Sequence, residues 1–99
     1  MNLAVMLSSD RPRAVEEATA LCLAAVRAGN RASLFLLGDG TTHAERASAV
    51  ARQGVRVSLC EADAAVRGIH KSGQPGVFFG SLYDWATLVE DADHVLSLC

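Results

Sequence analysis

The chain contains, at residues 55–69, the sequence Val55-Arg-Val-Ser-Leu-Cys60-Glu-Ala-Asp-Ala-Ala-Val-Arg67-Gly68-Ile69. Two valines and a leucine alternate with arginine and serine before the cysteine, which is the two-residue period of a strand with one buried face. Acidic residues in the turn after Cys60 and a glycine at position 68 favour a short helix between them. The stretch predicts a strand that runs directly into a helix, with a cysteine at the junction.

The same alternation of strand and helix extends over the rest of the chain. Continuous apolar runs at residues 3–7 and 32–37 are typical of central strands that are covered on both faces. Strict alternation of five strands with four helices predicts an α/β protein with a mostly parallel sheet, right-handed connections and helices on both faces. The strands are expected near residues 3–7, 32–37, 55–59, 77–79 and 94–98.

Local sequence signals indicate where two helices begin and which oppositely charged side chains can pair on a helix surface. Residues 42–45 and 81–84 each have a hydroxyl residue followed three positions later by an acidic one, the pattern of a capping box at a helix start. Asp63 and Arg67 are four residues apart, so we expect them to pair on the helix surface.

Composition restricts the class of protein. The 99 residues suit one domain, residues 1–99, and 51% of them are hydrophobic while the net charge is −2. Such a chain lacks the basic patches of a nucleic-acid-binding protein, and its apolar runs are too short to span a membrane. The first residues read as a strand rather than as a signal peptide. Three cysteines without a CxxC pair indicate reduced thiols and a cytoplasmic location.

Ligands of open parallel sheets bind outside the carboxyl ends of the strands. This rule places Ser9, Asp39, Cys60 and Ser81 on one edge of the domain, and we consider them candidate site residues. Cys60 is the strongest nucleophile among them, and it precedes a predicted helix whose free N–H groups favour a thiolate.

Some charged residues near Cys60 disfavour its thiolate, and others favour it. Glu61 and Asp63 disfavour a thiolate, whereas Arg67, His70 and Lys71 could offset them. Arg67 and His70 are further candidate binding residues. Cys22 lies on an apolar helical stripe and is expected to be a buried packing residue.

Other sites are not indicated. The turn at residues 38–40 lacks the spacing of a phosphate-binding loop or a dinucleotide fingerprint. The three histidines share no ligand spacing, so we expect neither a metal nor another cofactor.

The sequence resembles the DsrE/DsrF/TusD-like family of small sulfurtransferase and sulfur-relay proteins. Three segments carry the resemblance: the cysteine, helix and Arg-Gly of residues 60–68, the strand with its Asp-Gly turn at residues 34–40, and the closing helix and strand within residues 80–98. The resemblance implies a three-layer α/β/α sandwich with a five-stranded parallel sheet. It also implies a homo-oligomer, from dimer to hexamer, and a persulfide carried on Cys60.

Three functions follow as hypotheses. The first is a sulfur carrier that takes a persulfide onto Cys60 from a donor protein and passes it to an acceptor thiol. The second is a non-catalytic subunit that serves in an oligomer or binds a small ligand. The third, a nucleotide-binding module, has only the fold in its favour. We further expect the face with Tyr83 and Trp85 to be core or subunit interface, and no disulfide to join Cys60 and Cys99 within one molecule.

Overall fold

The computed structural model describes residues 1–99 and contains one five-stranded sheet in the order β4-β3-β2-β1-β5. Every neighbouring pair of strands is parallel. This arrangement confirms the predicted parallel sheet, and each strand end lies within one residue of its predicted position. The strands are β1 (Asn2–Leu7), β2 (Arg31–Leu36), β3 (Arg56–Cys60), β4 (Val77–Gly80) and β5 (His94–Leu98).

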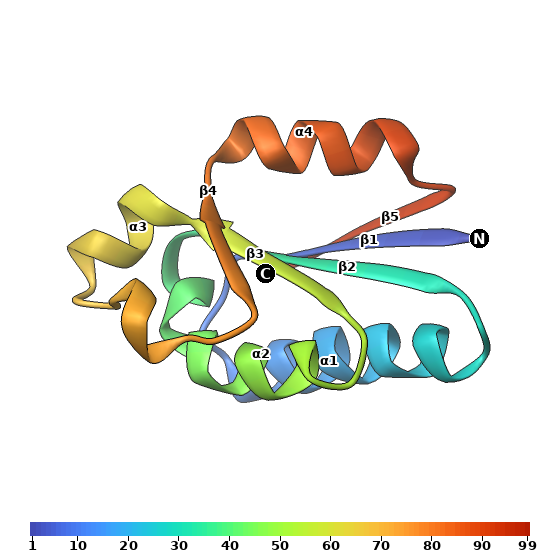
Figure 1. Ribbon diagram of the computed structural model, residues 1–99, viewed down its shortest axis with the longest axis horizontal. Coiled ribbons are helices and arrows are strands. Elements are labelled where there is room, and N and C mark those ends of the chain that lie inside the picture. Colours follow the sequence, from blue (N-terminus) through green and yellow to red (C-terminus); the bar gives the residue numbers. More distant parts are fainter.

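Helices cover the two faces of the sheet unequally (Figure 1). Strands β1 to β4 follow one another in the same direction across the sheet, so right-handed connections keep α1 and α2 on one face. The chain then returns to β5 on the other side of β1, which places α4 alone on the opposite face. The helices are α1 (Pro12–Arg27), α2 (Ala44–Ala51), α3 (Glu61–Val66) and α4 (Leu82–Asp91), with short 3₁₀ helices η1 (Gly38–His43) and η2 (Lys71–Gly73).

The main core lies between the sheet and the α1–α2 layer. In-register parallel pairing aligns the odd residues of β1 with Leu34 and Leu36 of β2, and all of these face α1 and α2. Cys22 of α1 is fully buried in this layer, which confirms its predicted packing role. The largest completely buried side chains on both sides of the sheet are Phe35, Leu7, Leu34, Leu36 and Leu59.

The opposite face is only partly covered, and polar residues lie on it. Phe35 and Trp85 pack together there, with ring centroids 5.9 Å apart, but α4 contains no buried residue. Ser33 of β2 shares this face with Phe35 because side chains two apart point to the same side. On this face of β2, Phe35 is fully buried as predicted, whereas Ser33 is only half-buried, because one helix is too narrow to cover five strands.

The two predicted capping boxes have different outcomes. The box at residues 81–84 is confirmed, because the Ser81 hydroxyl accepts from the Tyr83 N–H and the Asp84 carboxylate accepts from the Ser81 N–H. The box at residues 42–45 is wrong. Thr42 instead donates its hydroxyl proton to the Asp39 carbonyl, and the segment winds as η1 before α2 begins at Ala44.

None of the helices combines the length and the apolar character that a membrane crossing requires.

Candidate functional site

Cys60 is the last residue of β3 and the N-cap residue of α3. Its backbone is extended, at φ −76° and ψ 112°, so the chain passes from strand to helix without a loop. Cys60 is half-buried and its thiol is free. The α3 helix has only six residues, so it aligns fewer peptide dipoles behind Cys60 than a helix of ordinary length would.

The start of α4 approaches the same edge of the sheet. Cys60 pairs in register with Gly80 of β4, and α4 begins two residues later at Leu82. A Cβ atom at Gly80 would lie 2.3 Å from the Asp84 carboxylate that closes the Ser81 capping box. Glycine at position 80 therefore allows the first turn of α4 to lie close to the end of β4, beside the strand that carries Cys60.

An ion pair and hydrogen bonds hold α3 against the turn after β2. Arg67 donates from Nη2 to Asp39 Oδ1 at 2.9 Å and from Nη1 to the Asp63 carbonyl at 3.0 Å. The Asp63 carboxylate accepts from the Gly38 N–H at 2.7 Å. The predicted pairing of the Asp63 and Arg67 side chains is therefore wrong, because residues brought close by the sheet offer Asp63 a backbone donor and Arg67 a free carboxylate.

The remaining predicted site residues have different surroundings. Ser9 is buried, and its hydroxyl accepts from the Arg11 N–H at 3.0 Å, so it stabilises the turn before α1. Ser81 caps α4. His70 is exposed just before η2. Of the six predicted residues, the structure joins Asp39 and Arg67 directly and places them beside the helix that Cys60 begins.

The other two cysteines differ from Cys60 in accessibility. Cys22 is fully buried, and burial raises the pKa of its thiol from 9.0 to about 12. Cys99 is exposed at the chain end after β5. Strands β2 and β1 separate β3 from β5, which at about 4.8 Å per strand puts the two thiols beyond the reach of one disulfide. All three thiols are free, as expected for Cys60 and Cys99 within one molecule.

The prediction about the aromatic face of α4 needs correction. Trp85 turns toward the sheet and packs on Phe35, whereas Tyr83 is 79% exposed on another side of the helix. Residues two apart on a helix lie about 200° apart around its axis, so they cannot form one face.

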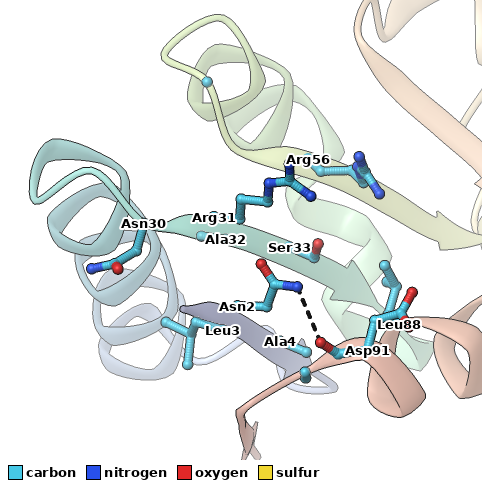
Figure 2. A pocket seen from close by; sticks show the side chains of 12 residues that line it. Asn2, Leu3, Ala4, Asn30, Arg31, Ala32, Ser33, Arg56, Leu88 and Asp91 are labelled. Atoms are coloured by element: carbon cyan, nitrogen blue, oxygen red, sulfur yellow. Dashed lines mark hydrogen bonds between the residues drawn. The ribbon is translucent and has the colours of Figure 1, made fainter.

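Sequence reasoning did not find a cavity at the opposite end of the strands. It has a volume of about 400 Å³ and lies beside α4, over the amino ends of β1, β2 and β3 (Figure 2). Arg31, Ser33 and Arg56 belong to its lining. The available signal was the presence of arginine and serine at alternate positions in strands that are otherwise apolar.

The strand order, the parallel pairing and the unequal helix layers define an α/β/α protein with the DsrE-like fold. The structure is similar to that of the YchN protein from E. coli, with a TM-score of 0.79, 23% sequence identity and coverage of 99% of this chain and 100% of that chain. It is also similar to MTH1491 from Methanobacterium thermoautotrophicum, a protein of unknown function, with a TM-score of 0.66, 16% identity and coverage of 96% and 97%.

At these identities the likeness establishes the fold alone. No protein-family model matches the sequence, and no curated protein matches it. The function must therefore be argued from the residues of this chain.

Proposed function

We propose that the protein is a sulfur carrier that holds a persulfide on Cys60 and passes it to an acceptor thiol. The observation that carries this proposal is the position of Cys60, a half-buried, partly accessible free thiol at the carboxyl edge of a parallel sheet. Thiol exchange requires a sulfur that a donor molecule can reach. Cys22 does not meet this requirement, because it is buried and its pKa is raised to about 12.

The proposed reaction is a thiol–persulfide exchange. The Cys60 thiolate attacks the terminal sulfur of a donor persulfide, RS–SH. A new bond forms between Cys60 Sγ and that sulfur, the S–S bond of the donor breaks, and the donor leaves as the thiolate RS⁻. An acceptor thiolate then attacks the terminal sulfur on Cys60 and regenerates the Cys60 thiolate. Neither step needs an external oxidant or reductant.

The contacts around α3 support this role for Cys60. The Asp63 carboxylate accepts from the Gly38 N–H, and the Arg67 guanidinium at the far end of α3 is paired with Asp39. A carboxylate with a hydrogen-bond partner repels a nearby thiolate less than a free one does. Glu61, the residue after Cys60, is exposed.

The test is the intact mass of the protein after incubation with glutathione persulfide. The wild-type protein should gain one sulfur atom, the Cys60→Ser variant none, and the Cys99→Ser variant as much as the wild type. A second incubation with excess acceptor thiol should remove the added sulfur. Equal uptake by Cys60→Ser and wild type would exclude Cys60 as the carrier. The proposal places the protein in the reducing cytoplasm, where the Cys60 thiol stays available.

A second candidate function is a non-catalytic subunit that binds a small ligand or serves in an oligomer. The cavity beside α4 favours the binding of a small ligand. Exposed apolar residues on α4 and β5, including Leu82, Tyr83 and Val95, favour a homo-oligomer of two to six copies. Iodoacetamide labelling at neutral pH distinguishes this candidate, because a packed Cys60 would react as slowly as Cys22. Light scattering at micromolar concentration tests the oligomer, and a monomer mass would exclude it.

A further inference from the structure

The cavity beside α4 is separate from the edge that carries Cys60. The first residues of β1, β2 and β3 form its floor, and the last turn of α4 forms one wall (Figure 2). Its volume of about 400 Å³ falls within the range of small-molecule sites. Cys60 lies at the other end of β3, four residues after Arg56, which corresponds to about 13 Å along a strand.

Two arginines extend into this region from neighbouring strands. Arg56 pairs in register with Ser33, and Arg31 precedes Ser33 by two residues on the same face of β2. Strand spacing and rise place the Cα atoms of the two arginines about 8 Å apart. Figure 2 shows both side chains over the same side of the sheet. The two ion pairs of the structure belong to Arg13 and Arg67, so neither Arg31 nor Arg56 has a carboxylate partner.

Both arginines are exposed, and the β1 side of the cavity is polar. Asn2 donates from Nδ2 to the Asp91 carbonyl at 3.0 Å, and its own N–H is held by the Asp93 carboxylate at 2.7 Å. These bonds fix the rim of the cavity to the end of α4. Parallel sheets normally bury apolar residues on both faces, so arginine and serine on β2 and β3 mark a face that is suited to a polar occupant rather than to a packed helix.

We propose that this cavity binds a small molecule through an oxyanion group, a carboxylate or a phosphate. Arg31 and Arg56 present guanidinium donors, whose planar geometry matches the oxygen pairs of both groups. The Ser33 hydroxyl, beside Arg56 on the next strand, supplies a further donor. Neither arginine has an ion-pair partner, so both guanidinium groups remain available to a bound anion. Asp91, the one acidic residue of the lining, disfavours an anion on the α4 side of the cavity. This proposal is independent of sulfur chemistry at Cys60.

The experiment is an amide NMR titration of the full chain with inorganic phosphate and, separately, with succinate at low ionic strength. Saturable shifts are expected at residues 2, 31–33, 56 and 88–92. Arg31→Gln and Arg56→Gln should each raise the Kd at least tenfold. Arg46→Gln on α2, on the other side of the sheet, removes the same charge and should leave the Kd within twofold. The spectrum of each variant also shows whether the fold is retained.

The two ligands distinguish the source of the oxyanion. Saturable binding of phosphate alone would identify a phosphate site, and binding of succinate alone would identify a carboxylate site. The proposal is overturned if neither ligand saturates, if Arg46→Gln weakens binding as much as Arg31→Gln, or if the shifts map elsewhere. It is also overturned if the arginine variants only dissociate an oligomer, because the cavity would then contact a second copy of the chain. The Cys60→Ser variant should bind the anion normally, which keeps this result separate from the sulfur-transfer test.

Discussion

Replacement of Asp63 with alanine should lower the free energy of unfolding by about 2 kcal/mol. The Asp63 carboxylate accepts a part-buried hydrogen bond of 2.7 Å from the Gly38 N–H and so ties α3 to the turn after β2. Hydrogen bonds to charged groups contribute ~1.5–3 kcal/mol, and loss of the acceptor leaves the N–H without a protein partner. In a domain of this size, 2 kcal/mol corresponds to a decrease in Tm of about 8–16 °C.

Two variants separate the hydrogen bond from other effects. Asp63→Asn keeps an amide oxygen that can accept from Gly38, so about half of the loss, ~1 kcal/mol, is expected for a neutral bond. Asp39→Ala removes the ion pair with Arg67. Because the Asp39 side chain is 62% exposed, this loss should be only ~0.2–1 kcal/mol.

Urea unfolding, followed by the fluorescence of Trp85, measures these differences. The m-values should remain equal, so that the shift in midpoint reports stability alone. If Asp63→Ala is within 0.5 kcal/mol of wild type, on the order of the scatter for surface substitutions, the hydrogen bond to Gly38 does not hold α3. If Asp63→Asn loses as much as Asp63→Ala, the negative charge rather than the acceptor oxygen is responsible.

Three further predictions concern the core, a close backbone contact and a helix cap. Burial raises the pKa of Cys22 from 9.0 to about 12. The contribution of the neutral, buried thiol to the free energy of unfolding is therefore complete below pH 9 and declines as the pH rises toward 12. Stability from urea unfolding should fall by up to ~4 kcal/mol over that range, and Cys22→Ala should remove this part of the slope. A Cβ atom at position 40 would lie 2.1 Å from the Leu7 carbonyl oxygen, so Gly40→Ala should cost at least ~2 kcal/mol in thermal unfolding, whereas Gly73→Ala, which has open space, should change stability little. Ser81→Ala removes the α4 cap and should lower stability by ~1 kcal/mol; an unchanged Tm would contradict the capping role.

The order of elements could be predicted because the signals are local. Apolar periodicity indicated the strands, and Gly68, which adopts φ +72°, marked the end of α3. The Ser81 capping box formed as predicted because its donors and acceptors lie within four residues of one another. Alternation of strand and helix then required a parallel sheet, since each strand must be joined to the next by a crossover.

Similar local patterns failed where other partners, near or distant in the chain, compete. Residues 42–45 have the same type of capping pattern as residues 81–84, yet Thr42 bonds to Asp39 because the chain packs closely against the end of β1 at Gly40. Asp63 bonds to Gly38, 25 residues away, instead of to the Arg67 side chain. The sequence offers each side chain several partners, and the spatial arrangement selects among them.

The sequence by itself determined the class of fold and the place of Cys60 at the end of a strand, because both depend on residues that are adjacent in the chain. Only the tertiary structure decided which residues surround the cavity beside α4. Its lining comes from positions as distant as Asn2, Arg31, Arg56 and Asp91. They meet because the strand order places α4 alone on its face of the sheet, and one helix leaves the first residues of β2 and β3 uncovered.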